Sequence, residues 1–195
     1  MKTELTKEIE KNFVHFLYEK KYELAVMECW LGRYGIVDLL SYHGELVSNG
    51  RGKPRTRNST WRCYEVKSSK ADFYSKHKWS FIGHYNYFVM PQELYNIVKQ
   101  DIPKGIGCYV YLGNGKFRSA KKATKTKMKI SESQMQHDFL VSSARDARRW
   151  MDCKWKGECI MEMLRNNDTS LPTTEKIFYQ MKRFLVLRKS STILV

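Results

Sequence analysis

The stretch WRCYEVKSSKADF (residues 61–73) joins the pattern of a β-strand to that of a helix start and carries two opposite charges inside the strand. Side chains alternate between the two faces of a strand, so Glu65 and Lys67 lie on the same face. One interpretation is a surface ion pair, which adds little stability. The other is that a carboxylate and an ammonium group are held together because a ligand or a reaction needs both.

The charge of the whole chain favours a polyanionic partner. The 195 residues suit one main domain with an appendage, and 35 Lys and Arg against 20 Asp and Glu give a formal net charge of +15. Residues 51–78 hold nine basic and two acidic side chains, and residues 116–129 hold seven basic and none acidic. Such concentrated charge attracts nucleic acid, because each neutralised phosphate releases counterions. A solvated basic surface is the alternative.

The chain has no run of about eighteen apolar residues, and its first residues lack the apolar centre of a signal peptide. These features predict a cytoplasmic protein that does not enter a membrane. The five cysteines include no C-x-x-C pair and have no histidine placed to complete a zinc site. They are interpreted as reduced, mostly structural thiols.

Hydrophobic periodicity predicts an α/β fold. Ser69 followed by Asp72 is typical of a capping box and predicts a helix to about Trp79. The polar run 44–60 indicates a hairpin turn or a longer flexible loop. The other expected elements are a helix over 5–17, strands over 22–30, 35–43 and 61–68, a strand over 85–91, a helix over 92–100 and a strand over 105–113. This order predicts a mixed central sheet flanked by helices.

The C-terminal third differs in composition from the rest. After Gly115 the chain is rich in lysine, and residues 131–166 have the spacing of one or two helices. We therefore expect a core domain over 1–118 and, over 119–195, a basic linker with a mainly helical extension whose packing on the core stays open. One role for such an extension is binding of a protein partner.

Three acids are candidates for a metal site. Glu28 and Asp38 lie inside the first two predicted strands, and Asp38 stands between Val37 and Leu39, where an unpaired charge is costly. If these strands neighbour the one that carries Glu65, the three carboxylates converge and repel one another unless a cation offsets them. Mg²⁺ or Mn²⁺ suits such oxygen ligands and would activate a water on a phosphodiester, assisted by Lys67.

The same residues resemble a known pattern. Asp38 in the VDLL strand and Glu65-Val66-Lys67 in the next strand match the PD-(D/E)xK nuclease superfamily, and Glu28 is placed like the upstream acid of many members. In addition, YEVKSSKADFYSKHKW followed by YNYFVMP resembles the MmcB-like DNA-repair family and related phage proteins. The resemblance covers about residues 5–118 and does not reach the C-terminal third.

This resemblance implies a restriction-endonuclease-like core, a metal-dependent nuclease site and work on DNA. The chain departs from the pattern in three ways. No proline precedes Asp38, a long basic insertion separates Asp38 from Glu65, and Asn86 stands where many relatives carry an acid. These departures bear on substrate geometry more than on the metal site.

The expected function is therefore a Mg²⁺- or Mn²⁺-dependent deoxyribonuclease that acts in DNA repair, recombination or phage DNA metabolism. Asp38 and Glu65 would bind metal, Glu28 would add a ligand or position a water, and Lys67 would assist attack. The side chains expected to grip DNA are Arg51, Lys53, Arg55, Arg57, Lys78, Lys121, Lys122 and Lys125. The alternative is a nuclease-derived DNA-binding module without catalysis. Cutting both strands usually takes two active sites, for which a homodimer would serve.

Overall fold

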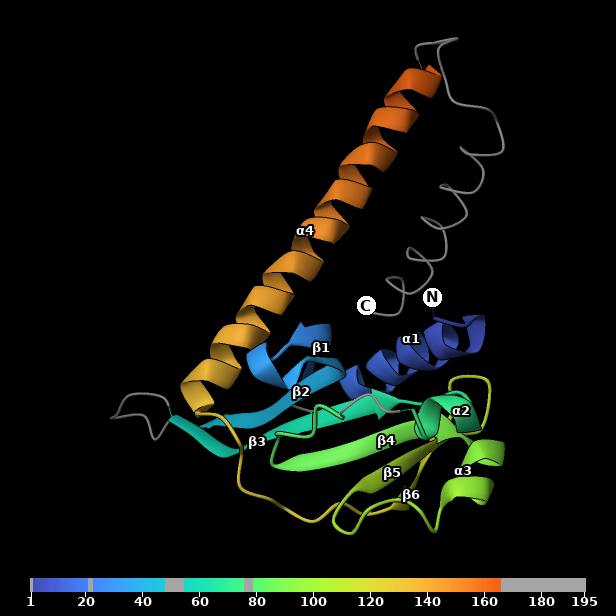
Figure 1. The fold of residues 1–195 in the computed structure, drawn as a ribbon. Helices are drawn as coiled ribbons and strands as arrows, with labels where there is room; N and C mark the ends of the chain where they lie inside the picture. The colour runs from blue at the N-terminus through green and yellow to red at the C-terminus, as the bar shows by residue number, and fades with distance from the viewer. Residues whose placement is uncertain (1, 21–22, 48–54, 76–78, 166–195) are drawn as a thin grey trace. The chain divides into compact units, whose positions relative to one another are not determined.

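The structure is a computed structural model that describes residues 2–20, 23–47, 55–75 and 79–165. Figure 1 shows a sheet with helices on both faces. Its strands are β1 (Glu23–Trp30), β2 (Ile36–Val47), β3 (Arg55–Val66), β4 (Tyr85–Pro91), β5 (Gly107–Tyr111) and β6 (Phe117–Lys121). The helices are α1 (Glu4–Tyr18), the short 3₁₀ turn η1 (Gly32–Tyr34), α2 (Lys70–Phe73), α3 (Gln92–Val98) and α4 (Glu132–Arg165).

The six strands lie in the sheet in the same order as in the chain. The pairs β3–β4 and β4–β5 are parallel, and the other neighbours are antiparallel. The predicted mixed sheet flanked by helices is therefore confirmed. Strand β6 was not expected, because its sequence FRSAK has little of the β-branched and aromatic content that indicates a strand. It pairs with β5 and so extends the sheet to Lys121.

Two hydrophobic layers hold helices on opposite faces of the sheet. Helix α1 begins at the N-cap Thr3, whose hydroxyl accepts a hydrogen bond from the Thr6 N–H. Its buried stripe includes Ile9, Phe13 and Leu17 and packs on the strand residues of one face. The other face is covered by residues of α2, α3 and the start of α4, namely Phe73, Leu94, Val98 and Met135.

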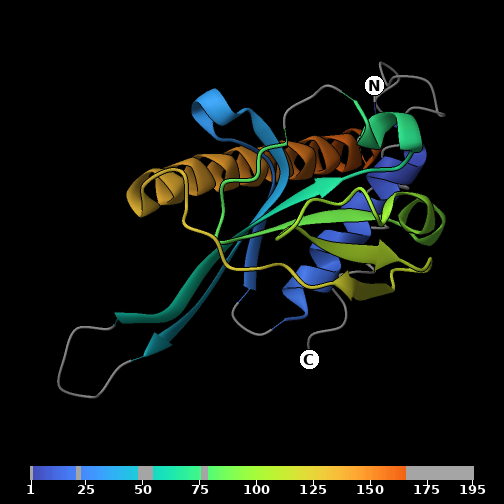
Figure 2. The same ribbon diagram turned by 60° about the horizontal axis from the view of Figure 1, so that its bottom comes forward.

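Residues 44–47 and 55–60 of the polar run lie in strands, and the predicted turn or longer loop falls on 48–54, outside the described residues. Figure 2 shows the paired strands β2 and β3 extending past the neighbouring strands. Helix α2 is shorter than predicted. Ser69 caps it as expected, by accepting from the Asp72 N–H, but α2 ends at Phe73, and Trp79 and Ser80 lie outside any helix.

The lysine-rich segment after β6 follows the sheet instead of leaving it. The backbone N–H groups of Thr124, Thr126 and Lys129 donate to the carbonyls of Gly105, His84 and Ile82. The chain divides into two compact units, Met1–Ser143 and Ala144–Val195, and α4 contributes to both. The expected boundary between a core over 1–118 and an extension over 119–195 stays a prediction.

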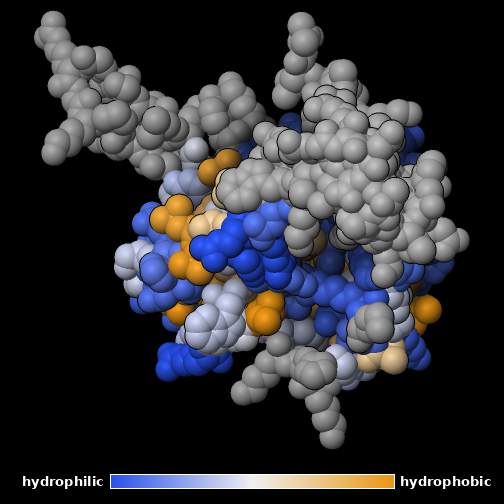
Figure 3. Space-filling model, turned by 90° about the horizontal axis from the view of Figure 1, so that it is seen from above, coloured by the Kyte–Doolittle hydropathy of each residue, from blue (hydrophilic) through white to orange (hydrophobic). Residues whose placement is uncertain are grey.

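The surface seen in Figure 3 is mainly hydrophilic, and its hydrophobic atoms appear in separate groups. In the described part of the chain, no helix has both the length and the apolar character needed to cross a membrane. Cys29, Cys63 and Cys108 are buried free thiols, which confirms the structural interpretation for these three cysteines.

Candidate active site

The candidate site lies where β2 and β3 separate. The β2–β3 ladder runs from Val47 and Arg55 to Leu39 and Tyr64. Beyond that pair β2 stays with β1, whereas β3 stays with β4. At the point of separation the Asp38 carboxylate replaces a backbone partner, since its Oδ2 accepts from the Val66 N–H at 2.8 Å. The opening between the two strands therefore places Asp38 beside the Glu-x-Lys segment.

Glu65 is held from the opposite side by a residue distant in the chain. Its Oε1 accepts from the Ser80 N–H at 3.0 Å, and the Ser80 hydroxyl donates to the carbonyls of Tyr34 and Ile36. Ser80 thus ties the third strand to the start of β2. The prediction of a helix to about Trp79 is wrong, since α2 ends at Phe73 and Trp79 and Ser80 lie outside any helix.

Asp38 and Glu65 act on each other electrostatically. The pKa of Glu65 is raised from 4.5 to about 7, by burial first and by the charge of Asp38 second, against the opposing effects of the Ser80 N–H and the Lys67 ammonium. Burial also raises the pKa of Asp38, against the Val66 N–H and the positive charges of Lys2 and Lys67. Two partly desolvated carboxylates that resist ionisation are the situation that a bound cation relieves.

Lys67 is buried beside these acids. Its side chain is only 8% exposed, and its Nζ lies 3.4 Å from Oδ1 of Asp72. The other oxygen of Asp72, Oδ2, accepts from the Ser68 N–H at 3.4 Å. The Lys67 backbone N–H donates to the Val89 carbonyl on β4. Asp72, expected mainly as a helix cap, therefore also supports the lysine of the site.

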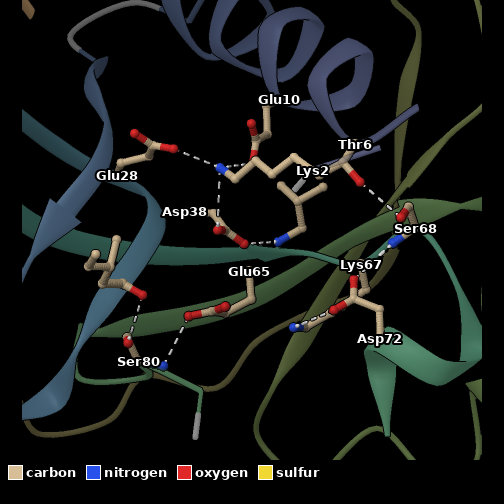
Figure 4. A network of polar contacts seen from close by, with 12 residues as sticks. Lys2, Thr6, Glu10, Glu28, Asp38, Glu65, Lys67, Ser68, Asp72 and Ser80 are labelled. Carbon is tan, nitrogen blue, oxygen red and sulfur yellow. Dashed lines mark hydrogen bonds and ion pairs between the residues drawn. The ribbon is translucent and has the colours of Figure 1, made fainter. Parts of the chain in front are cut away.

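A second lysine, Lys2, reaches into the same region from the N-terminal side (Figure 4). Its Nζ lies 2.6 Å from Oε1 of Glu10, 3.1 Å from Oε1 of Glu28 and 3.9 Å from Oδ1 of Asp38. One ammonium group therefore contacts three carboxylates from α1, β1 and β2. Burial alone lowers the pKa of Lys2, but the hydrogen bonds and charges of its acidic partners raise it overall.

Glu10 and Lys2 were not predicted as site residues. Glu10 is buried, and burial raises its pKa in spite of the nearby Lys2. A signal for Glu10 exists in the sequence, because it follows Thr6 by four residues and precedes Phe13 by three, which places an acid within the buried stripe of α1. Lys2 precedes the helix, and no periodic pattern marks it.

Glu28 has a partly exposed side chain and a backbone conformation that is unusual for a residue other than glycine. Its side chain is 43% exposed, and its φ of 47° lies in the left-handed region that residues other than glycine rarely adopt. On either side of it, β1 pairs with β2 through Met27–Leu39 and Cys29–Val37, so the irregularity occurs opposite Asp38. Strain of this kind costs about 1–3 kcal/mol and is concentrated at functional sites.

The predicted site residues thus come together around Asp38 within the first compact unit. The donor chemistry fits Mg²⁺ or Mn²⁺, because Asp38 and Glu65 provide hard oxygen ligands in a partly desolvated setting. Within residues 2–20, 23–47, 55–75 and 79–165, however, no group of three or more His, Cys, Asp or Glu has the geometry of a metal site. The positive charge beside Asp38 comes from the Lys2 ammonium group.

The structure describes only some of the residues that were predicted to contact DNA. Arg51, Lys53 and Lys78 lie outside the described residues, and of Arg55 and Arg57 only the backbone in β3 is described. Lys121 donates to the carbonyls of Ile102 and Pro103 at 2.8 and 3.2 Å, whereas Lys122 and Lys125 are exposed. Their role in DNA binding stays a prediction.

Asn86, which stands where relatives of the resembled family carry an acid, is a buried residue of β4. Its amide oxygen accepts from the Gly83 N–H at 3.1 Å, and its amide nitrogen donates to the Gly83 carbonyl at 3.2 Å. Both groups therefore stabilise the turn before β4. In this chain, position 86 serves the fold of that turn.

Comparisons with known proteins give a structural likeness. No family model and no curated protein matches the chain. Among solved structures, the SPO1766 protein of unknown function from Silicibacter pomeroyi is similar, with a TM-score of 0.53 and 16% sequence identity. The match covers 83% of this chain and 92% of that chain. At this identity the likeness concerns the fold alone.

Proposed function

We propose that this chain is a metal-dependent deoxyribonuclease with a restriction-endonuclease-like core. The observation that carries the proposal is the meeting of Asp38 and Glu65 at the separation of β2 and β3, with buried Lys67 on the same strand as Glu65. These are the residues that resemble the PD-(D/E)xK pattern. Their burial and mutual repulsion lower the stability of the fold, and such a costly arrangement is typical of a functional site.

Each side chain has a role that its surroundings support. Asp38 and Glu65 would hold Mg²⁺ or Mn²⁺, with Glu28 as a further ligand, and the ion would supply Lewis-acid activation of water and of the phosphodiester. Lys67 would orient the attacking water and neutralise charge on the scissile phosphate. Asp72 positions Lys67, and the N–H groups of Ser80 and Val66 orient the two carboxylates.

DNA is the proposed substrate because of the charge distribution. The two basic segments over 51–78 and 116–129 would contact the phosphate backbone, which positions a substrate without reading its sequence. We place the protein in the cytoplasm and in DNA repair, recombination or phage DNA metabolism, with a homodimer as the arrangement for cutting both strands.

The test is cleavage of supercoiled, linear and single-stranded DNA with Mg²⁺ or Mn²⁺. Lys67→Ala is expected to lower cleavage about 100-fold or more, with DNA affinity in EDTA changed by less than about threefold. Lys70→Ala is the matched control, because Lys70 is an exposed lysine three residues further on, in α2. Thermal unfolding of both variants, and of Lys67→Met, separates lost chemistry from lost folding. Cleavage by Lys67→Ala at the parent rate would contradict the proposal.

One observation favours a second candidate, a nuclease-derived DNA-binding module without catalysis. The Lys2 ammonium already offsets the charges of Glu10, Glu28 and Asp38, so the carboxylates have a resident cation. In that case the affinity for DNA would fall steeply as the salt concentration rises, and neither Mg²⁺ nor Mn²⁺ would produce cleavage. A crystal soaked in Mn²⁺ distinguishes the candidates, because anomalous density between Asp38 and Glu65 supports the nuclease.

A further inference from the structure

Two large hydrophobic side chains are exposed directly beside the candidate active site. Trp30 at the end of β1 is 66% exposed, and Ile36 at the start of β2 is 59% exposed. They form the last pair of the β1–β2 ladder. The Cβ atoms of such a pair are about 5 Å apart and lie on the same face, so the two side chains form one continuous apolar surface.

This surface lies close in the chain to two of the acids. Ile36 precedes Asp38 by two residues in β2, and Trp30 follows Glu28 by two residues in β1. Two residues of a strand span about 7 Å, so a base on Trp30 would be close to a phosphate at Asp38.

Hydrogen bonds hold the turn that carries the pair. The turn between the strands is closed by the bond from the Leu31 N–H to the Gly35 carbonyl at 2.8 Å, and Leu31 is buried. The Ser80 hydroxyl holds the carbonyls of Tyr34 and Ile36, and so links the turn to Glu65. An exposed aromatic on a fixed support loses little conformational entropy when a ligand stacks on it.

The charge around the pair selects the kind of ligand. Arg33 in the turn adds a guanidinium group, which lies over the ring of Tyr34 at 5.1 Å, and the chain as a whole carries a net charge of +15. An apolar surface with a guanidinium group in the adjoining turn, beside candidate phosphodiester chemistry, suits a nucleobase whose phosphates are near. Stacked bases within a duplex do not present their faces, so the ligand is an unstacked base.

We infer that Trp30 and Ile36 form a stacking platform for one unstacked nucleobase next to the scissile phosphate. This inference rests on the proposed function and adds a substrate class to it, namely single-stranded DNA or DNA with frayed ends. It assigns Trp30 to substrate binding and not to chemistry.

The test measures binding of the full chain in EDTA, so that no cleavage is required. The probes are short oligo-dT strands with one 2-aminopurine at successive positions. The parent should quench the 2-aminopurine at one or two adjacent positions. Trp30→Ala should remove this quenching and weaken binding about tenfold, whereas Trp30→Phe, which keeps a ring, should stay within about threefold.

The matched control is Leu24→Ala, because Leu24 is also an exposed large hydrophobic residue of β1, 55% exposed, at the other end of the strand. It should leave quenching and affinity unchanged. An abasic site at the quenched position should weaken binding of the parent and add nothing in Trp30→Ala. Equal affinity and equal quenching in the parent and Trp30→Ala would overturn the inference, as would a parent that binds no DNA at low salt.

Two further measurements keep the inference separate from the proposed function. If Trp30→Ala abolishes self-association in sedimentation velocity and leaves DNA affinity unchanged, the pair is a contact between protein copies and the inference fails. Lys67→Ala should keep the position-specific quenching. If Lys67→Ala cuts at the parent rate but the quenching pattern still depends on Trp30, the nuclease mechanism fails and the stacking platform stands.

Discussion

Replacing Glu65 with glutamine should stabilise the metal-free protein, and the gain should depend on pH. Glu65→Gln keeps the shape of the side chain and an oxygen that accepts from the Ser80 N–H, but it cannot ionise. A carboxyl group with a raised pKa in the native state favours folding while it is protonated. This contribution is complete below pH 4.5, declines as the pH rises, and is lost above about pH 7.

The magnitude follows from the pKa. A rise from 4.5 to about 7 corresponds to about 3 kcal/mol of unfolding free energy, because one pKa unit is worth about 1.36 kcal/mol. The causes are burial first and the charge of Asp38 second. At pH 4.5 the two proteins should therefore have similar stability. At pH 8 the glutamine variant should be more stable by about 3 kcal/mol.

The assay is urea unfolding in EDTA at pH values from 4.5 to 8, followed by fluorescence and circular dichroism. The matched control is Glu19→Gln, which neutralises an exposed carboxyl group at the end of α1. Its effect should stay within about 0.5 kcal/mol over the same range. Addition of Mn²⁺ at pH 8 should stabilise the parent and not Glu65→Gln, because binding to the native state adds to its stability.

A difference between the parent and Glu65→Gln that does not change with pH would refute the reasoning. So would a parent that gains stability over the variant between pH 4.5 and 7, since that is the sign expected for a carboxylate held ionised by its partners. Either result would mean that the partners of Glu65 in the folded protein stabilise its ionised form. The carboxylate would then not require a cation.

Three further predictions concern the surroundings of the site. Lys2→Met should lower the unfolding free energy at pH 8 by about 1–3 kcal/mol, because it leaves the buried Glu10 carboxylate unpaired, and Mn²⁺ should recover part of the loss in urea unfolding. Glu28→Gly should be more stable than Glu28→Ala by about 1 kcal/mol in the same assay, since φ at this position is 47°; equal stabilities would show that the backbone relaxes. Gly107→Ala should lower the unfolding free energy by about 2 kcal/mol, measured by thermal unfolding, because a Cβ there would lie 2.4 Å from the Tyr87 ring and 2.8 Å from a backbone nitrogen; an unchanged Tm would contradict this contact.

Local sequence patterns predicted most of the elements. The stripe of α1, the alternation in β3 and the turn signals between the strands indicated where most helices and strands lie, although not all of their ends. These patterns are short in range, because hydrophobic periodicity and capping depend on neighbours within a few residues. Strand β6 was missed for the same reason, since FRSAK becomes a strand through pairing with β5 and not through its own propensity.

Part of the candidate site was also visible in the sequence. Alternation alone placed Glu65 and Lys67 on one face, and a charge between apolar residues singled out Asp38. Glu10 carried a weaker signal, as an acid within an apolar helical stripe. Lys2 carried none, because its contact with Glu28 joins residues 26 positions apart that no local pattern connects.

The sequence by itself determined the kinds of element and the charges each one carries. Only the tertiary structure decided that β2 leaves β3 at Asp38, that Ser80 reaches back to Glu65, and that the Lys2 ammonium lies among three carboxylates. The physical reason is that the local patterns depend on residues a few positions apart. Convergence, burial and the pKa of a carboxylate depend on which distant segments share the same small volume, and that is settled when the sheet and its helices pack together.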